Sequence, residues 1–350
     1  MADVIHVITD MGIGGAGVLL SHLLSKDPEG SLAALPEGSL LSTFFQKNGV
    51  PYVTHPQNGE RSFSPIAVYH LRRLFKRESP RLVVSHASLA ARVAAKLLSI
   101  PTLSVRHCDT PIRPFTVGLY NALTDATVAT SLPLGAHLNA AGIRRVYTVE
   151  NGYTDMGVPS PFERRAAKRH FSLPEGCVAI GLVGRLSPIK GQETAIRALH
   201  RLGEKGRDLF LCFLGDGEER ERLCALSASL HLQDRVRFFG HSPDVKTFYH
   251  AIDAHLSTSL GSETSSLSLA EGMSAGCPTI ASDTEGNRAR LAGGGRLFPP
   301  GDAETLSALL PSLLDESERK RLSQMAIKRK ETLSTWEEMA KKYRRIFDAF

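Results

Sequence analysis

The pattern of apolar and polar positions alternates between short apolar runs and longer segments with helical periodicity. The run VIHVITD at 4–10 is followed by a helical segment, and the same order recurs around PYVTH, LVVSH and TLSVRH. Strand-like runs that alternate with helical segments are typical of βαβ units and a parallel sheet. We therefore expect an α/β protein built on doubly wound parallel sheets.

The length of the chain and one break in this pattern predict two domains. A chain of 350 residues is long for a single hydrophobic core. Prolines and the basic run ERRAAKR interrupt the alternation, and CVAIGLVGRL then starts a second series of strands. The expected parts are an N-terminal domain at 1–156, a linker and lead-in helix at 157–176, a C-terminal domain at 177–332 and a final amphipathic helix at 333–350.

Composition excludes several classes of protein. The five cysteines are scattered and form no C-x-x-C pair, which argues against a disulfide framework or a zinc site and favours a reducing compartment. No apolar run reaches the ~18 residues that a membrane-spanning helix needs, and a strand follows Met1 without a signal-like segment. We expect a cytoplasmic protein.

The net charge of +6 permits acidic partners such as nucleotides, phospholipids or nucleic acid. The excess divides evenly between 1–160 and the remainder, and no basic stripe carries stacking aromatic residues. We therefore expect no nucleic-acid partner. The run LRRLFKRESPR at 71–81 combines apolar and basic residues. It is either a solvated face over a core stripe or a peripheral contact with an anionic membrane, on the inner face of the membrane.

A glycine-rich turn follows the first strand. Gly12, Gly14 and Gly17 satisfy G-x-G-x-x-G, and such a turn lets the backbone approach a phosphate closely. One interpretation is an NAD-dependent oxidoreductase in which Glu37, 20 residues after Gly17, binds the ribose. The same turn serves many nucleotide and sugar-phosphate sites, so the motif does not choose between them.

The stretch STSLGSETSSLSLAEGMSAGCPTIASD at 257–283 carries two carboxylates at the opening of a predicted helix. Glu263 and Glu271 are eight residues apart, an offset of about 80° around a helix. They are placed to line two parts of one ligand, and a carboxylate accepts both hydroxyls of a vicinal diol. The alternative is one capping and one solvated carboxylate. The helix-cap candidates are Thr264, Ser265 and Ser266, and Leu267 opens the apolar pattern.

Two cations follow the first strand of the second half. Arg185 and Lys190 stand in GRLSPIKG, which begins at Gly184 and ends at Gly191. Arginine offers a planar fork to phosphate oxygens, and lysine adds a mobile point charge. Together they would stabilise a diphosphate leaving group as its charge grows. The alternative is a solvated loop.

These two motifs together resemble the donor-site signature of retaining GT-B glycosyltransferases of the family-four, group 1 type, and the resemblance extends along most of the chain. It implies two Rossmann-like domains that face a central cleft. The N-terminal domain would lie on the acceptor side and the C-terminal domain would bind the nucleotide-sugar. The final helix would pack back on the N-terminal domain.

The resemblance also implies roles for individual residues. Arg185 and Lys190 would stabilise the departing diphosphate, Glu271 would bind the ribose, and Glu263 with His107 would orient the sugar. The donor-binding positions that match the family are Gly14, Gly15, Gly184, Gly215, Gly217, His241, Thr264, Ser265, Ser266 and Leu267. The neighbours of His107 that we also consider are Arg106 and Asp109, and the turn that leaves the first domain is Asn151–Gly152.

The chain departs from the family pattern in three places. Gly17 stands where an acidic residue often follows Gly-Gly-Ala, so no carboxylate there acts on the acceptor. Thr264 and Ser265 replace the usual glycine and apolar residue after the first glutamate, which leaves the donor sugar open. The run TEGNRARL at 284–291 lacks the Gly-Gly and acid often found there.

The resemblance implies a retaining transferase that moves a hexose or N-acetylhexosamine from a nucleotide-sugar to a saccharide or lipid-linked saccharide acceptor in cell-surface glycan synthesis. A UDP-sugar is favoured over a GDP-sugar. No metal ion or cofactor is expected, because Arg185 and Lys190 supply positive charge and no Asp-x-Asp ligand pair occurs. The alternatives are the NAD-dependent oxidoreductase, and a GT-B epimerase or phosphorylase.

Overall fold

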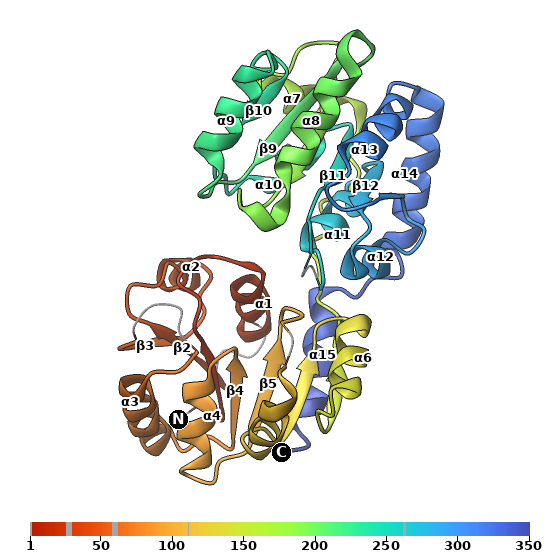
Figure 1. Ribbon diagram of the computed structural model, residues 1–350. Helices are drawn as coiled ribbons and strands as arrows, with labels where there is room; N and C mark the ends of the chain where they lie inside the picture. The colour runs from red at the N-terminus through yellow and green to blue at the C-terminus, as the bar shows by residue number, and fades with distance from the viewer. Residues whose placement is uncertain (1, 26–29, 58–61, 111, 262–263) are drawn as a thin grey trace. The chain divides into compact units, whose positions relative to one another are not determined.

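The computed structural model describes residues 2–25, 30–57, 62–110, 112–261 and 264–350. The chain forms two compact units: residues 1–152 together with 334–350, and residues 153–333. In each unit, helices flank a parallel sheet (Figure 1). The expectation of two doubly wound, Rossmann-like parallel sheets is confirmed.

The sheet of unit 1 has the order β3-β2-β1-β4-β5-β6-β7 in the described part of the chain, and every neighbouring pair is parallel. The strands are β1 (Val4–Ile8), β2 (Ser31–Pro36), β3 (Tyr52–His55), β4 (Leu82–His86), β5 (Thr102–Arg106), β6 (Ala126–Ala129) and β7 (Val146–Thr148). The strand order reverses between β1 and β4. In open α/β sheets, ligands bind at the carboxyl edge beside such a reversal.

The helices of unit 1 cover a sheet whose central strands are buried along their whole length. All residues of β1 and β4 are buried, as expected for parallel strands with helices on both faces. The helices are α1 (Gly15–Leu24), α2 (Leu41–Lys47), α3 (Pro65–Glu78), α4 (Leu89–Lys96), α5 (Val117–Ala122), α6 (Leu132–Ala140) and α15 (Trp336–Phe347). Serines at the N-caps of α3, α4 and α6 accept hydrogen bonds from backbone N–H groups and fix where these helices begin.

The last helix, α15, belongs to unit 1 although it lies at the end of the chain. A capping box begins it, and its indole ring at Trp336 stacks on His22 of α1 with ring centroids 4.2 Å apart. A Cβ atom at Gly152 would lie 2.5 Å from the Trp336 backbone. Arg81 donates a hydrogen bond of 2.6 Å to the Phe347 carbonyl. These contacts tie both ends of unit 1 together.

The sheet of unit 2 has the order β10-β9-β8-β11-β12-β13 in the described residues, again with parallel pairs. The strands are β8 (Val178–Val183), β9 (Leu209–Leu214), β10 (Val236–Phe238), β11 (Ala254–Ser257), β12 (Thr279–Ser282) and β13 (Arg296–Phe298). The helices are α7 (Pro161–His170), α8 (Gln192–Leu202), α9 (Arg220–Ser229), α10 (Val245–Ala251), α11 (Leu267–Ser274), α12 (Glu285–Leu291), α13 (Ala303–Leu309) and α14 (Glu316–Lys330). The strand order reverses between β8 and β11.

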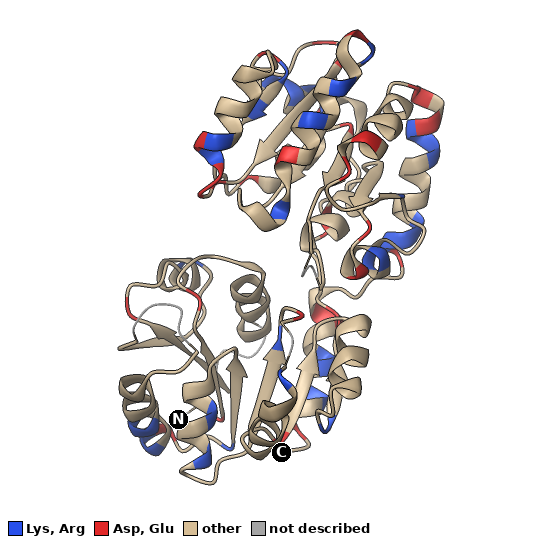
Figure 2. Ribbon diagram, in the orientation of Figure 1, with Lys and Arg blue, Asp and Glu red and all other residues tan. Residues whose placement is uncertain are grey.

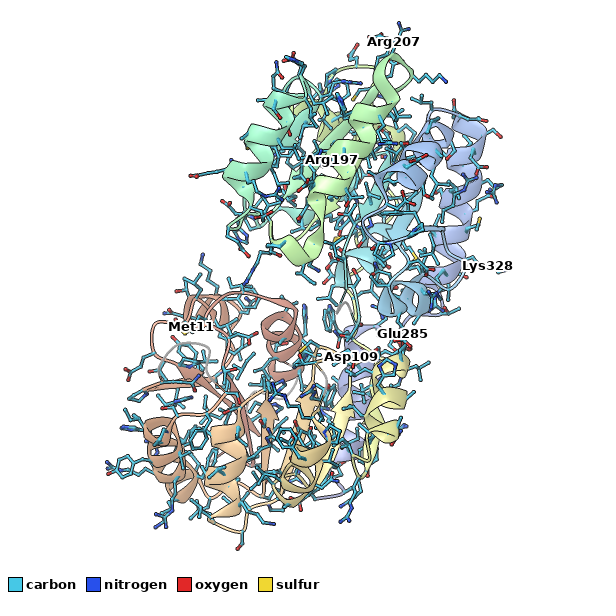
Figure 3. The ribbon with its side chains drawn as sticks, viewed as in Figure 1. Met11, Asp109, Arg197, Arg207, Glu285 and Lys328 are labelled. Atoms are coloured by element: carbon cyan, nitrogen blue, oxygen red, sulfur yellow. The ribbon has the colours of Figure 1, made fainter. Side chains whose placement is uncertain are left out.

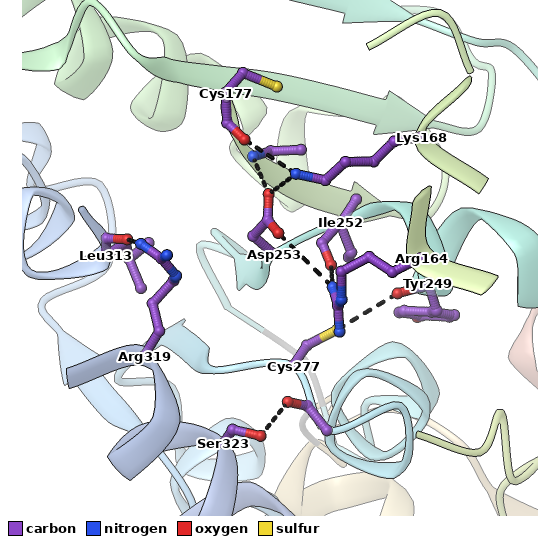
Figure 4. Close-up of polar contacts among 12 residues, drawn as sticks. Arg164, Lys168, Cys177, Tyr249, Ile252, Asp253, Cys277, Leu313, Arg319 and Ser323 are labelled. Atoms are coloured by element: carbon purple, nitrogen blue, oxygen red, sulfur yellow. Dashed lines mark hydrogen bonds and ion pairs between the residues drawn. The ribbon is translucent and has the colours of Figure 1, made fainter. Parts of the chain in front are cut away.

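Helix α7 lies in the segment 157–176, which was expected to form a linker and lead-in helix. Its Lys168 contacts the Asp253 carboxylate at 2.6 Å, and the same carboxylate accepts a 2.8 Å hydrogen bond from the Ala179 N–H (Figure 4). Arg164 donates a 2.6 Å hydrogen bond to the Ile252 carbonyl. These bonds make α7 an integral part of unit 2. The division between the units falls at 152/153, four residues before the expected position.

Candidate functional site

The carboxyl edge of unit 2 beside the β8–β11 reversal carries the two cations predicted from the sequence. The loop that follows β8 contains Arg185, which is exposed, and Lys190, which is half-buried. Thr258, after β11, donates a 2.8 Å hydrogen bond to the Lys190 carbonyl, and Leu260 N–H donates one of 2.8 Å to the Ile189 carbonyl. The loop after β8 is thereby fastened to the loop after β11.

Glycine is required where these two loops meet. Gly191 has a φ of +60°, and a Cβ atom there would lie 2.4 Å from the Thr258 carbonyl oxygen. Gln192, the next residue, donates a 2.8 Å hydrogen bond to the Arg185 carbonyl. Both cations therefore lie on a loop whose backbone is held by hydrogen bonds at several points. A rigid loop of this kind keeps binding side chains in place, as a functional site requires.

The glycines after β9 pack against the loop that carries Arg185. Gly215 and Gly217 were expected to let the backbone approach a nucleotide. A Cβ atom at Gly215 would lie 2.0 Å from the Gly184 carbonyl, and one at Gly217 would lie 2.3 Å from the Leu186 carbonyl. The space that they leave is filled by the protein's own loop, which is joined to theirs by backbone hydrogen bonds of 3.0 Å. They hold the loop that carries Arg185 in place.

Helix α11 begins at the same edge of the sheet. Ser266 is its N-cap and accepts a hydrogen bond from the Leu269 N–H, so one of the three cap candidates is the observed cap. Of the other two, Thr264 is buried and Ser265 is half-buried. Leu267 is the first helical residue, as expected. Glu263 lies outside the described residues.

A small cavity joins Lys190 to the first turn of α11. Its volume is about 20 Å³, and it is lined by residues of β8 and β11 together with Lys190 and Ser268. The N-terminus of a helix carries partial positive charge and unsatisfied N–H groups. Lys190 and α11 therefore direct positive potential to one point at the strand-order reversal, which favours an anion there.

Glu271 lies about one turn further along α11. The Tyr249 hydroxyl is 3.2 Å from its Oε2 atom and 3.1 Å from the Ser268 carbonyl oxygen. Burial raises the pKa of Glu271 to about 7, although the Tyr249 hydrogen bond and the charge of Arg290 act in the opposite direction. The sequence could not identify Tyr249 as a partner, because it lies on α10 and no motif marks it.

The neighbouring cations of unit 2 are paired with carboxylates. A pocket of about 410 Å³ is lined by residues of α8, of the loops after β8 and β11, of the start of α9 and of the start of α13. Its Glu193 contacts Arg197 at 2.6 Å and Arg222 at 2.5 Å. Glu219 also contacts Arg222. Figure 3 shows Arg197 on α8. The carboxylates of this network already balance its cations, which makes it poorly suited to bind a polyanion. His241, another predicted position, is exposed after β10.

The glycine turn of unit 1 connects β1 to α1. Gly14 is the N-cap of α1 and Gly15 its first residue. A Cβ atom at Gly17 would lie 2.4 Å from the Leu41 side chain, so Gly17 allows close packing on α2. Glu37, the ribose acid of the oxidoreductase interpretation, follows β2 and its N–H donates to the His55 carbonyl.

His107 follows β5 and contacts His86, which in turn contacts His6, and no motif in the sequence connects these three histidines. The Nε2 atom of His107 is 2.9 Å from Nδ1 of His86, and Nε2 of His86 is 3.2 Å from Nδ1 of His6. Burial lowers the pKa of His6 to about 3 and that of His107 to about 4, and it holds the pKa of His86 well below its ordinary value. All three rings are therefore neutral near pH 7.

The residues next to His107 take part in local contacts. Arg106 donates a 2.5 Å hydrogen bond to the Thr110 carbonyl. Asp109 forms a 2.7 Å ion pair with His137 of α6, and both side chains are partly exposed.

The described helices include none that is long and apolar enough to cross a bilayer.

Two family models match the chain. The model described as glycosyl transferases group 1 matches residues 163–329, and the model described as glycosyltransferase family 4 matches residues 27–155. The two matches are consecutive, and each falls largely within one of the two units.

The relatives that match in sequence are also named as glycosyltransferases. The chain is 28% identical over 268 residues to the lipopolysaccharide core biosynthesis glycosyltransferase LpsE of Rhizobium meliloti. The matched segment covers 76% of this chain and 74% of that protein. It is 31% identical over 219 residues to the 2-deoxystreptamine glucosyltransferase of Streptomyces kanamyceticus. That match spans only 56% of either chain.

Solved structures share the fold along the whole chain. Anabaena Alr3699/HepE in complex with UDP and glucose matches with a TM-score of 0.88 at 18% identity, covering 100% of both chains. WaaG, a glycosyltransferase involved in lipopolysaccharide biosynthesis, matches with a TM-score of 0.77 at 16% identity, covering 97% of this chain and 98% of that one. The chain thus belongs to the group 1, family-four glycosyltransferases and has their GT-B fold.

Proposed function

We propose that this enzyme transfers a hexose or N-acetylhexosamine from a nucleotide-sugar, with retention of anomeric configuration, to a saccharide or lipid-linked saccharide acceptor in cell-surface glycan synthesis. The relatives LpsE and WaaG are named for lipopolysaccharide synthesis, which supports the acceptor class. HepE was solved with UDP and glucose, which supports a UDP-sugar. A GDP-sugar is the second choice, since another relative is a GDP-mannose-dependent mannosyltransferase of Mycobacterium tuberculosis.

The observation that carries this proposal is that Lys190 and the first turn of α11 line one small cavity at the carboxyl edge of unit 2, at the β8–β11 reversal. We place the diphosphate of the donor on this edge of the sheet, outside the cavity, which holds only about one water molecule. When the bond between the sugar and the diphosphate breaks, negative charge grows on the leaving oxygens. Lys190, Arg185 and the helix N-terminus stabilise that charge without moving. These groups supply the positive charge of the step, so the mechanism does not call for a metal ion.

The remaining roles concern the two sugars of the donor. The Glu271 carboxylate accepts hydrogen bonds from the ribose hydroxyls, and Glu263 and His107 orient the transferred sugar. The position of Glu271 supports its role in binding the ribose. Glu271 lies on α11, the helix whose N-terminus we place at the diphosphate. The same face of α11 then spans from the phosphates to the ribose, as the order of these groups in a nucleotide-sugar requires.

The test compares two lysines of unit 2. Lys190→Ala is expected to lower kcat for sugar transfer or donor hydrolysis by roughly 10²–10³-fold, the usual effect of losing one strong transition-state contact. Lys205→Ala is the control, because Lys205 is exposed in the short 3₁₀ segment after α8. Equal activity of the two variants would refute the assignment. The anomeric configuration of the first-formed product, read by ¹H NMR, tests retention separately.

A thermal-shift panel identifies the nucleotide. UDP, GDP and ADP, each with and without a sugar, are added to the purified chain, because a bound ligand raises apparent stability by mass action. The largest shift is expected for UDP compounds. A shift with NADH alone would instead support the oxidoreductase interpretation, which the comparisons do not support.

We also propose that α3 contacts an anionic membrane surface. The apolar residues of the run at 71–81, among them Leu71, Leu74 and Phe75, are buried against the core of unit 1. The outer face carries basic residues (Figure 2) and the exposed side chains of Ile66 and Tyr69. Each basic residue near an anionic surface adds about 1 kcal/mol of attraction. Sedimentation with vesicles that contain anionic lipid at low salt tests this; failure to sediment leaves α3 as a solvated face.

A further inference from the structure

Three imidazole rings form a continuous chain across neighbouring strands of unit 1. His6 lies on β1, His86 is the last residue of β4, and His107 follows β5. Because β1 pairs with β4 and β4 pairs with β5, these side chains are brought together by the sheet itself. His6 and His86 are fully buried, at 0% and 1% exposure, and His107 is half-buried.

The number of hydrogen atoms on the nitrogens of the three rings restricts which tautomers they can adopt. Each ring–ring hydrogen bond contains one hydrogen, and each neutral ring carries one. His86 uses both of its nitrogens, one toward His6 and one toward His107. It therefore donates to one neighbour and accepts from the other. All three rings must then carry their hydrogen on the same kind of nitrogen: Nδ1 in every ring, or Nε2 in every ring.

The buried His6 ring, at one end of this row of rings, decides between the two tautomer arrangements. The Nε2 atom of His6 is buried and has no hydrogen-bond partner among the described residues. With Nε2–H rings, this atom would be a buried donor without an acceptor, whereas with Nδ1–H rings it holds only an unused lone pair. Orphaned N–H groups are the rarer of the two in folded proteins. The Phe347 ring, 5.6 Å from the His6 ring, would offer an N–H group only a weak interaction.

We propose that His86, backed by His6, is a positioning residue that fixes the His107 ring as its Nδ1–H tautomer, with its Nε2 atom held by His86. His107 then acts at Nδ1 as a hydrogen-bond donor toward an oxygen of the transferred sugar. This function of the tautomer rests on the proposed role of His107 in binding the donor sugar. The assignment of the tautomer follows from the ring–ring contacts and the buried Nε2 atom of His6, and it does not require the transferase activity.

A fixed tautomer matters because a half-buried imidazole otherwise exchanges between donor and acceptor at Nδ1. A sugar oxygen then meets the correct form only part of the time. A ring whose hydrogen is already on Nδ1, and whose orientation is held by a 2.9 Å contact, needs no such adjustment. The low pKa values of the three rings support this arrangement, since a protonated ring would break the single direction of the chain.

The direct test reads the tautomers by NMR of the full chain with ¹⁵N-labelled histidine. Long-range ¹H–¹⁵N correlations distinguish the protonated ring nitrogen from the unprotonated one. We expect Nδ1–H for His6, His86 and His107 at pH 7. Three Nε2–H rings, or a His107 ring that averages between tautomers, would overturn the proposal. This measurement needs no substrate, so it stands even when the proposed transferase reaction fails.

Variants of His86 test its effect on the reaction. In His86→Asn, the side-chain amide reaches the place of Nδ1 and can donate to His107, whereas His86→Leu leaves His107 without this partner. We expect His86→Asn to keep the His107 tautomer and nearly all of kcat. We expect His86→Leu to lose about tenfold in kcat, the worth of about one hydrogen bond, with a His107 ring that averages between tautomers.

Melting temperatures of both variants separate positioning from simple structural support. A purely structural His86 would make activity follow stability in the two variants and would leave the His107 tautomer unchanged in both, and that result overturns the proposal. When wild-type protein binds no nucleotide-sugar and turns none over, the proposed function has failed, and the NMR experiment still decides the tautomer.

Discussion

The raised pKa of Glu271 predicts opposite pH dependences for the free protein and for its donor complex. The pKa rises from the ordinary 4.5 to about 7 because the carboxyl is buried on α11. In the unfolded chain this carboxyl is ionised above about pH 4.5, whereas in the folded protein it stays protonated up to about pH 7. The folded state therefore binds more protons between these values.

The sign and size of the effect on stability follow from this difference. Stability falls with rising pH wherever the folded state binds more protons than the unfolded state. The stabilising contribution is constant below about pH 4.5 and is lost by pH 7. At 1.36 kcal/mol for each pKa unit, the loss is at most about 3 kcal/mol. In a domain of this size that corresponds to a decrease in Tm of several degrees, at about 2–4 °C per kcal/mol.

Donor binding changes in the other direction. Ribose hydroxyls donate to the ionised carboxylate, so binding must first remove the proton from Glu271. Below pH 7, the Kd for UDP is expected to increase by up to about tenfold for each pH unit, and above pH 7 it is expected to level off. Isothermal titration calorimetry with UDP between pH 5 and 8 measures this slope.

The variant Glu271→Gln removes both effects, because an amide does not ionise. We expect its Tm to match the wild type near pH 4 and to exceed it at pH 8, and we expect its UDP affinity to be weak at every pH. Glu204→Gln, at an exposed position, is the control. A wild-type UDP affinity that does not change between pH 5 and 8 would refute the role of Glu271 in binding the ribose.

Two further predictions concern the framework of unit 2. Gly215→Ala places a Cβ atom 2.0 Å from a backbone carbonyl at a φ of +142°, so we expect a loss of more than about 2 kcal/mol in the free energy of unfolding. Gly261→Ala, whose added Cβ atom meets no atom of the described residues within 4 Å apart from its chain neighbours, should change it little, and equal urea midpoints for the two would contradict this account. Asp253→Asn removes the charge that faces Lys168 at 2.6 Å. We expect a loss of about 2–3 kcal/mol by urea denaturation, and a midpoint like that of the wild type would show that α7 is held by other contacts.

Local pattern in the sequence was enough to predict the parallel sheets and the loop that carries Arg185 and Lys190. It did not reveal β2, because the run SLAALP contains alanine and leucine, which favour helices, and only its pairing with β1 and β3 makes it a strand. It also did not reveal the environment of Glu271. The Tyr249 contact joins two helices whose relation depends on packing, and no spacing rule in the sequence encodes it.

Gly215 and the three histidines show the same limit of prediction from local sequence. Gly215 was expected to let the backbone approach a nucleotide, and the sequence did not reveal that the atoms nearest to an added side chain there belong to the protein's own loop after β8. His6 has no local signature at all on β1. Its relation to His107 passes through His86 and appears only when three strands lie next to one another.

The placement of α15 has a consequence for how the protein is made. Unit 1 needs residues from both ends of the chain, since Trp336 packs on His22 and against Gly152. During synthesis, residues 1–152 leave the ribosome well before residues 334–350. Unit 1 therefore stays incomplete, with the surface of α1 that α15 covers still exposed, until unit 2 has been synthesised. The second unit, whose residues are continuous, is free to finish first. A nascent chain that is released without its last seventeen residues would carry a complete second unit joined to an unfinished first one.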